Sequence, residues 1–143
     1  IHMRIRKRSF SIETSDRFDI QNVSPEVTAA IEELGAEDGL VWASTPHTSA
    51  ALSTNEFEEK LLFDMKRRFM EFAPPDDGYY HDIDHINRGE QPNAHAHILS
   101  AMIKRPVLTL LQDGELDLGT WEELMFFELC GPREREVDVV VLD

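Results

Sequence analysis

The sequence predicts a β-rich α+β fold with a mainly antiparallel, sandwich-like core of two sheets and about three helices on the outside. Short apolar runs bounded by turn residues recur through the chain and fill its last third, which is typical of strands. Three other segments space their apolar residues as an amphipathic helix does. The length of 143 residues suits one domain with one core.

The first elements are a strand and a helix. Residues 4–12 alternate basic with apolar or small side chains, which indicates a half-exposed strand. The helix follows at Ser24, which we expect to be its N-cap, with Pro25 in the first helical position and Gly35 as its stop. Residues 39–44 are predicted to be the next strand.

The middle of the chain contains a strand, a helix and a long irregular segment. Residues 50–53 are predicted to form a strand after the corner at Thr45-Pro46-His47. Apolar residues recur at helical spacing over 57–72, and two prolines end that helix. The segment 73–92 is rich in Pro, Asp, Gly and His, so we expect a loop that is either functional or disordered.

The last third begins with a short helix and continues as strands. Asn93 is expected to cap a helix that carries Ile98 and Ile103. Asp113-Gly114 between two apolar runs is a strong hairpin signal. The predicted strands are 107–111, 116–118, 124–129 and 137–142.

Composition limits the classes of partner. Acidic residues outnumber basic ones by 28 to 14, for a net charge of −14, so neither nucleic acid nor an anionic membrane is an expected partner. The single cysteine excludes an internal disulfide and favours a reducing, cytoplasmic location. We expect a single domain over 4–143, with Ile1-His2-Met3 as a cloning remnant plus the start methionine.

Five histidines are the first candidates for chemistry: His47, His81, His85, His95 and His97. Imidazole is the commonest transition-metal ligand and a proton shuttle near neutral pH. His81 and His85 have the i,i+4 interval of helical zinc pairs, although their surroundings have the composition of a loop. His95 and His97 would diverge by about 200° on a helix, so only one of them could face a site. The alternative is an acidic surface loop that happens to carry histidines.

A second constellation joins His47-Thr48-Ser49 to Asn55-Glu56 through a short strand. One end of the strand would present an imidazole and two hydroxyls, and the other an amide and a carboxylate. The structural alternative is that Thr48 and Ser49 turn the chain while Asn55 and Glu56 open the next helix.

Four later residues complete the candidates. Thr120 and Trp121 follow Gly119, and the indole could stack on a ring-shaped ligand or simply fill the core. Glu128 interrupts an apolar run, so it either points outward or is buried and paired. Arg133 is a cation that could meet a phosphate or that carboxylate, or lie in a surface turn.

Taken together, these residues resemble the YjbQ family, also described as secondary thiamine-phosphate synthases. The resemblance covers nearly the whole chain in order, with His-Thr-Ser-Ala and Gly-Thr-Trp as its most specific pieces. It runs through His47-Thr48-Ser49-Ala50, Asn55-Glu56, Tyr80-His81-Asp82, Asn93 with His97, Asp113-Gly114, Gly119-Thr120-Trp121, Glu128 and Gly131-Pro132-Arg133.

The resemblance implies a small β-rich α+β fold and a homotrimer with sites near subunit boundaries. It implies that His47, His81 and His97 are the functional histidines, and that His85 and His95 are incidental. It also implies a secondary activity that couples a pyrimidine diphosphate to a thiazole phosphate and releases pyrophosphate. The physiological substrate does not follow from that name.

The chain departs from the family pattern in three places. Phe57-Glu58-Glu59 stands where an Asp-Pro is usual, Glu122 replaces a glutamine after Gly-Thr-Trp, and Lys104 stands where a glycine usually ends the helix. These changes leave the three histidines in place and affect the expected substrate specificity.

The leading hypothesis is a metal-assisted enzyme, a transferase acting on a small phosphorylated molecule. His47, His81 and His97 would hold one divalent ion, with zinc expected first and magnesium or nickel as alternatives. Glu56 or Glu128 would act as general base or fourth ligand, Asn55, Thr48 and Ser49 would orient substrate oxygens, and Thr120, Trp121 and Arg133 would contact substrate. One alternative is a module that binds a metal or small anion without turnover. The other is a structural protein with surface histidines.

Overall fold

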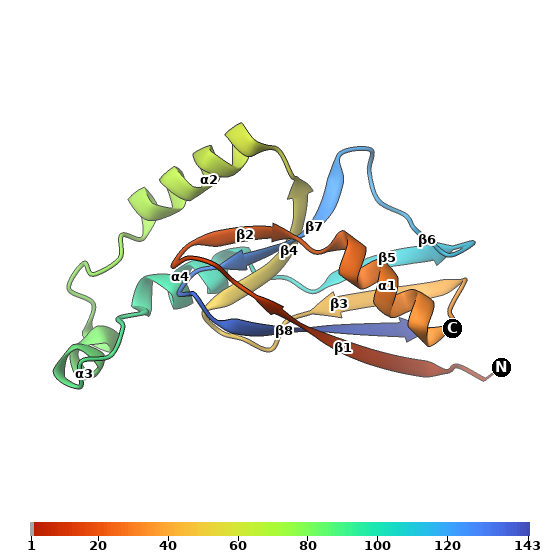
Figure 1. The fold of residues 1–143 in the computed structure, drawn as a ribbon, viewed down its shortest axis with the longest axis horizontal. Helices are drawn as coiled ribbons and strands as arrows, with labels where there is room; N and C mark the ends of the chain where they lie inside the picture. Colours follow the sequence, from red (N-terminus) through yellow and green to blue (C-terminus); the bar gives the residue numbers. More distant parts are fainter. Residues whose placement is uncertain (1) are drawn as a thin grey trace.

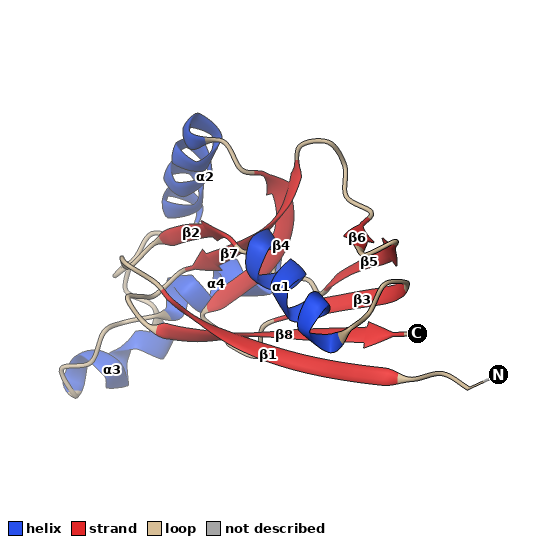
Figure 2. Cartoon of the chain, turned by 45° about the vertical axis from the view of Figure 1, so that its right-hand side comes forward, coloured by secondary structure: helices blue, strands red, loops and turns tan. Residues whose placement is uncertain are grey.

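The computed structural model describes residues 2–143. Two antiparallel sheets form the core of this part of the chain, as the sequence predicts. The larger sheet has the order β1-β8-β3-β5-β6 and the smaller one β2-β7-β4 (Figures 1 and 2). The strands are β1 (Ile5–Glu13), β2 (Asp19–Asn22), β3 (Gly39–Ser44), β4 (Ala50–Glu56), β5 (Val107–Gln112), β6 (Glu115–Leu116), β7 (Glu122–Glu128) and β8 (Glu134–Leu142).

Four α-helices and one 3₁₀ turn lie around these sheets within residues 2–143. They are α1 (Ser24–Leu34), α2 (Glu59–Phe72), the 3₁₀ turn η1 (Tyr80–Asp82), α3 (Ile83–Asn87) and α4 (Ala94–Ile103). Figures 1 and 2 show α1 beside the larger sheet, α2 standing out from the body, and both termini at one end of the molecule.

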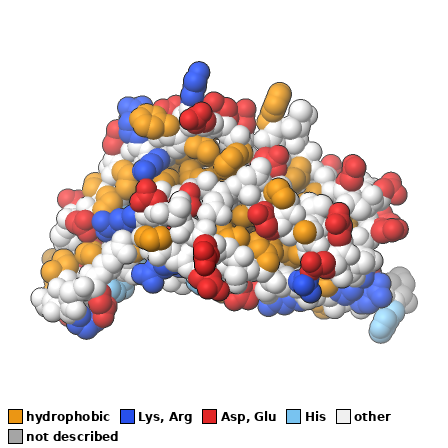
Figure 3. Space-filling model, viewed as in Figure 1, with side chains coloured by type: hydrophobic (Ala, Val, Ile, Leu, Met, Phe, Trp, Pro, Cys, Tyr) orange, Lys and Arg blue, Asp and Glu red, His pale blue; other side chains and the backbone are white. Residues whose placement is uncertain are grey.

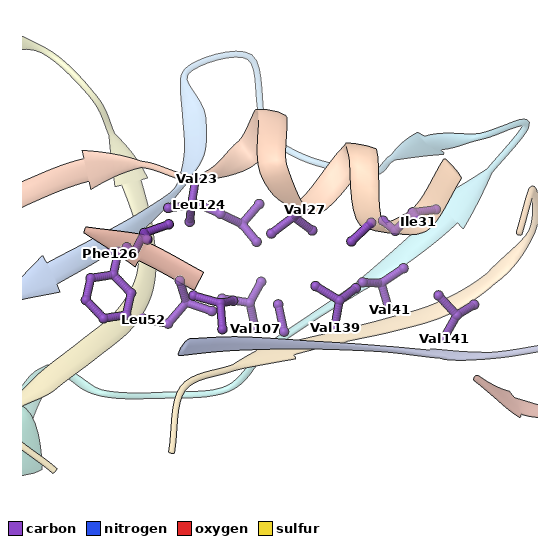
Figure 4. Packing of buried hydrophobic residues seen from close by; sticks show 14 of the residues in the cluster. Val23, Val27, Ile31, Val41, Leu52, Val107, Leu124, Phe126, Val139 and Val141 are labelled. Atoms are coloured by element: carbon purple, nitrogen blue, oxygen red, sulfur yellow. The ribbon is translucent and has the colours of Figure 1, made fainter. Parts of the chain in front are cut away.

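The main core lies between α1 and the two sheets. Val27 and Ile31 point from α1 toward valines of β3 and β8, and Leu52 and Phe126 of the smaller sheet close the cluster (Figure 4). Buried and more exposed residues alternate along β8 of the larger sheet, where every second residue from Arg135 to Val141 is buried. This strand therefore turns one face to the core and the other away from it.

The smaller sheet is covered on both faces, which explains the unbroken apolar run in β7. Phe126 faces the main core, whereas Met125 and Phe127 face a second cluster with Ala96 and Leu99 of α4. Residues of α2 pack only at the edge of that second cluster, and none of the helix is fully buried.

Several boundaries differ from those predicted. Ser24 is the first helical residue of α1 and not its N-cap: Val23 holds that position, and the Ser24 hydroxyl accepts from the N–H of Leu124 in β7. Gly35 ends the helix with φ of 66°, as expected. α2 starts at Glu59, where the carboxylate of Glu58 caps the N–H groups of the first turn.

The segment 73–92 is not a plain loop, because it contains η1 and α3. The short strand β2 was not predicted, since four half-buried residues beside β7 leave no alternating apolar pattern. Asn93 does precede α4, but its side chain makes no capping bond within the described chain. The side chain of Asp82 caps that helix instead, as described below.

Candidate functional site

One face of α4 binds the corner between β3 and β4, which consists of residues 45–49. His97 Nδ1 donates to the carbonyl of Thr48 at 2.9 Å, Ser100 Oγ to that of Ala50 at 2.7 Å, and Lys104 Nζ to that of His47 at 2.9 Å. These donors lie at i, i+3 and i+7, which is one stripe of a helix. The helix therefore holds the corner through side chains and places His97 beside Thr48.

His97 and His95 point in opposite directions, as the helical spacing requires. His95 is buried, and its Nε2 donates to the carbonyl of Leu129 at 3.0 Å. Burial lowers the pKa of His95, so this imidazole is neutral and structural. His97 is the member of the pair that faces a site, and its bond to Thr48 leaves the Nε2 lone pair free in the neutral ring.

Asp82 brings His81 to His97. Its side chain is 1% exposed, and Oδ1 accepts from the N–H of Asn93 at 3.0 Å and from that of Ala94 at 2.9 Å. This carboxylate caps the N-terminus of α4 and ties η1 to it. The rings of His81 and His97 consequently lie 5.0 Å apart between centroids and cross at 89°.

His85 joins this group from the next helical turn. Its ring centroid is 5.2 Å from that of His81, and its Nδ1 donates to the His81 carbonyl at 3.2 Å. The i,i+4 pair is therefore helical, because η1 and α3 replace the expected loop. The resemblance treats His85 as incidental, yet the structure places it against His81.

His47 lies on the other side of Thr48 and is used differently. Its Nε2 accepts from the backbone N–H of Glu136 at 2.9 Å, and Thr45 donates to the carbonyl of the same residue at 2.8 Å. The two side chains continue the β3–β8 ladder beyond the last paired residue of β3. Burial, and next the positive charge of Arg135, lower the pKa of His47, which favours the neutral acceptor ring.

Glu128 is buried and paired. Both of its oxygens lie 2.6 Å from the guanidinium of Arg135, and they also accept from the hydroxyl of Thr14 and the N–H of Cys130. Arg135 donates in addition to the hydroxyl of Ser49 at 3.0 Å. This ion pair supports the corner from inside the core, and Glu128 is 0% exposed.

Arg135 was missed from the sequence, and Arg133 was considered in its place. Arg133 is exposed and its Nε donates to the carbonyl of Cys130. The available signal was alternation: Arg135 shares the inward face of β8 with Val137 and Val139, where a cation needs a buried partner. Gly131 allows the close packing, because a Cβ there would lie 2.6 Å from Glu128 Cγ.

The other predicted residues lie away from the histidines within one chain. Asn55 and Glu56 are exposed at the far end of β4, about 20 Å along the strand from Ser49. Trp121 is 72% exposed rather than in the core, and Thr120 beside it is exposed too. β4 and β7 place Glu56 opposite Glu122, so these residues form a second group near the loop before β7.

Two open cavities meet at His97. One, of about 340 Å³, is lined by Thr48, His97, Ser100, Ala101 and Lys104. The other, of about 350 Å³, is lined by Tyr79, Tyr80, His81, Ala94, His97 and Ile98. We call the first the polar cavity, because most of its lining residues are polar or charged, and the second the apolar cavity, because aromatic and aliphatic side chains make up most of its wall.

The donor set fits a metal ion in part. His97 and His85 each donate Nδ1–H to a carbonyl, which is the usual support of a metal-binding imidazole. His47 does not fit as it stands, because its Nε2 lone pair is taken by Glu136. Across residues 2–143, no three His, Cys, Asp or Glu side chains are grouped so that they could hold a metal.

No helix within the same residues is both long and apolar enough to cross a membrane. Acidic side chains are spread over the face seen in Figure 3, and basic ones gather beside the N-terminus, where β1 carries Arg6, Lys7 and Arg8. Anionic ligands therefore meet an unfavourable field over most of this face.

Comparison with known proteins identifies relatives over nearly the whole chain. The family described as UPF0047 protein YjbQ-like matches residues 8–143. A UPF0047 protein of Archaeoglobus fulgidus is 35% identical over 133 residues, which cover 92% of this chain and 98% of that protein. The UPF0047 protein YugU of Bacillus subtilis is 32% identical over 129 residues, covering 90% and 92%.

Solved structures agree with this relationship. A YbjQ-like protein of unknown function from Sulfolobus solfataricus P2 superimposes with a TM-score of 0.87 at 29% identity, covering 99% of both chains. A hypothetical protein from Aeropyrum pernix K1 gives 0.85 at 31% identity, covering 94% of this chain and 96% of that one. On sequence and fold together, this chain belongs to the YjbQ-like UPF0047 family.

Proposed function

We propose that this protein binds a divalent metal ion through His81 and His97 and acts on a small phosphorylated metabolite beside it. The observation that carries the proposal is the crossed pair of imidazoles, 5.0 Å apart, at the meeting point of two cavities. Zinc is the expected ion, because imidazole nitrogen is among its preferred ligands, with nickel or magnesium as alternatives.

The residues of the site have separable tasks in this proposal. The Thr48 carbonyl holds the His97 ring in one tautomer, and Asp82 fixes the position of His81 through the N-terminus of α4. His47 becomes a third ligand only if its ring gives up the N–H of Glu136. When bound, the metal would supply Lewis-acid stabilisation of negative charge on phosphoryl oxygens.

We extend the proposal to group transfer of the kind the resemblance implies, with secondary thiamine-phosphate synthase activity. Two adjoining cavities, one polar and one apolar, suit a substrate with a phosphoryl group and a ring. The candidate bases do not reach these cavities within one chain, because Glu56 lies at the far end of β4 and Glu128 is held by Arg135.

We also propose that the protein is a homotrimer. The outer face of the larger sheet exposes Leu40, Trp42, Leu108 and Leu110, and register pairs Leu40 with Leu110 and Trp42 with Leu108. A continuous apolar patch of this kind is typical of a protein interface. In such an assembly, Asn55, Glu56 and Trp121 of one copy could complete the histidine site of another.

Sedimentation of wild-type protein and of a Trp42→Glu/Leu108→Glu variant tests the assembly. We expect a trimer for wild type and a folded monomer for the variant, because two buried carboxylates would oppose association. A monomeric wild type would contradict the proposal. A variant with glutamates at Phe63 and Phe72, exposed apolar residues of α2, is the control and should remain trimeric.

Metal binding is tested by titrating chelator-treated protein with zinc, nickel and magnesium in a calorimeter. We expect His81→Ala and His97→Ala each to weaken binding by at least about tenfold. His2→Ala is the control, because it removes an exposed imidazole outside the site, and it should bind as wild type does. Absence of binding by wild type, or equal losses in all three variants, would contradict the proposed site.

A non-catalytic metal- or anion-binding module is the second candidate function. The specific observation in its favour is that Glu128, the acid nearest the corner, is fully engaged in its ion pair. Incubation of metal-loaded protein with an aminopyrimidine diphosphate and a thiazole phosphate separates the two functions. Released pyrophosphate together with thiamine phosphate supports turnover, whereas ligands that bind and are recovered unchanged support the binding module.

A further inference from the structure

Lys104 is a cation placed beside His97 by the end of α4. Its side chain lines the polar cavity with Thr48, His97 and Ser100, and its Nζ donates to the carbonyl of His47 at 2.9 Å. Lys104 is half-buried. Partial burial removes some of the water around the ammonium and thereby lowers its pKa.

The corner does not need a positive charge at this position. Ser100 satisfies the carbonyl of Ala50 with a neutral hydroxyl, four residues earlier on the same stripe. An ammonium has three N–H donors, and the His47 carbonyl accepts only one of them. Two donors of Lys104 therefore remain for a group in the cavity.

Lys104 also has no carboxylate partner within the described residues, where nine ion pairs closer than 4.0 Å include none to its Nζ. Five of the 14 basic residues have no such partner among the described residues, and Lys104 is the half-buried one, because Lys60, Lys66, Arg105 and Arg133 are exposed. A half-buried cation without an acidic partner is destabilised by desolvation. An anion entering the cavity would restore the lost interactions.

We infer that Lys104 anchors the phosphoryl group of the ligand in the polar cavity, and that the ligand's ring lies across His97 in the apolar cavity. This inference rests on the proposed function for the identity of the site and adds the orientation of the ligand. The hydrogen of the Ser100 hydroxyl goes to the Ala50 carbonyl and is not available to a phosphoryl oxygen, whereas the exposed Thr48 hydroxyl can donate to one.

The apolar half of the ligand is assigned by the second cavity. Tyr79, Tyr80 and Ile98 are among its lining residues, and His97 lines both this cavity and the one that holds Lys104. A flat ring suits aromatic walls, because offset or edge contacts between rings add to simple burial. The predicted ligand class is therefore an aryl or heterocyclic phosphate, with its charged end toward the C-terminus of α4.

Calorimetric titration of chelator-treated protein with inorganic phosphate, pyrophosphate and phenyl phosphate tests the inference. The metal-free state is used so that loss of metal binding and loss of anion binding are read separately. We expect Lys104→Met to weaken binding of all three anions by roughly tenfold, equivalent to about 1.4 kcal/mol. Lys104→Arg should restore most of the affinity, since its charge and donors are retained.

Arg105→Met is the matched control, because it removes one positive charge from the exposed neighbouring residue. It should leave anion binding unchanged, whereas an equal loss would show that only the general field matters and would overturn the inference. Wild-type protein that binds none of the anions, or a folded Lys104→Met variant that binds them as wild type does, would also overturn it. If Lys104→Met does not fold, Lys104→Gln keeps a donor for His47 and replaces it in the comparison.

Phenyl phosphate tests the orientation. We expect it to bind wild-type protein several-fold more tightly than inorganic phosphate, and Ile98→Glu to abolish that advantage while leaving phosphate binding in place. Equal affinity of wild type for the two anions would contradict placement of the ring in the apolar cavity. Metal titration of Lys104→Met should give the wild-type affinity, which separates this inference from the metal proposal.

Discussion

At the scale of single residues, the histidines differ in the hydrogen bonds that their ring nitrogens make. Thr48 takes the Nδ1–H of His97, Leu129 takes the Nε2–H of His95, and Glu136 donates to Nε2 of His47. Three side chains of one type thus have three roles: one lines the two cavities, one fills the core, and one completes a sheet. Their spacing in the sequence carries no information about these partners.

The buried pair of Glu128 and Arg135 is the main residue-scale test of the core. Arg135→Met should destabilise the protein by about 3–5 kcal/mol, because a buried carboxylate is left without its counter-charge. The double variant Glu128→Leu/Arg135→Met should be less destabilised than the single one, since neither charge remains. Urea unfolding measures the free energy of unfolding of each variant. A double variant whose loss of stability equals the sum of two large losses from the single substitutions would contradict this account.

At the scale of elements, one side chain joins the two ends of the segment between α2 and α4. Arg17 donates to both oxygens of Asp76 and to the carbonyl of Pro92, so it holds the two ends of the segment that carries η1 and α3. His81 and His85 depend on this segment for their position. The tether explains how a stretch with the composition of a loop presents helical histidines.

We expect Arg17→Met to loosen that segment without unfolding the sheets. Hydrogen exchange of the amides in Tyr80–Asn87 should become faster, while amides of β8 keep their protection. Arg88→Met is the control, because Arg88 pairs only with Glu90 at two residues' distance. Equal protection of η1 and α3 in the two variants would show that Arg17 is not the tether.

The same tether gives a pH dependence with a defined sign. The hydrogen bond from Arg17 holds the pKa of Asp76 below its ordinary value of 3.8. A lowered folded-state pKa means that the stabilisation is complete above 3.8 and is lost as pH falls through the lower value. Protection factors of the amides in Tyr80–Asn87 should therefore be maintained near pH 4 and should decrease at lower pH. In the Asp76→Asn variant, the protection factors should show no such decrease.

Much of the element scale could be predicted from the sequence. The helix after Val23, the strands β3, β5, β7 and β8, and the hairpin at Asp113-Gly114 follow from apolar spacing and turn residues. The elements that could not be predicted are those that depend on residues outside their own segment. β2 exists because β7 accepts it along one edge, and α4 begins at Ala94 because Asp82, twelve residues earlier, caps it.

At the scale of the whole molecule, charge is the dominant property. The net charge of −14 implies self-repulsion that the folded state must overcome. Salt should therefore stabilise the protein, because the screening length falls to about 10 Å at 0.1 M. We expect a gain of about 1 kcal/mol between low and moderate sodium chloride, seen as a rise in Tm of roughly 3 °C. A Tm that falls with salt would show that ion pairs outweigh the repulsion.

The candidate site illustrates the limits of prediction at this scale. The sequence singled out His81 and His97, whose rings the structure brings together, and Ser49, whose buried hydroxyl accepts from Arg135. It also grouped Asn55, Glu56 and Trp121 with them, although β4 carries the first two to its opposite end. A motif read along one strand cannot show which end faces a helix and which faces solvent.

By itself, the sequence determined the fold class, the family, the excess of negative charge and the set of residues in which chemistry could lie. These depend on local properties: periodicity, turn residues and composition act between near neighbours in the chain. Only the tertiary structure decided that His97 lines both cavities, that Arg135 rather than Arg133 meets Glu128, and that Lys104 faces the cavity beside His97. Those outcomes depend on contacts between residues 7 to 57 positions apart, which form only when helix and sheets pack.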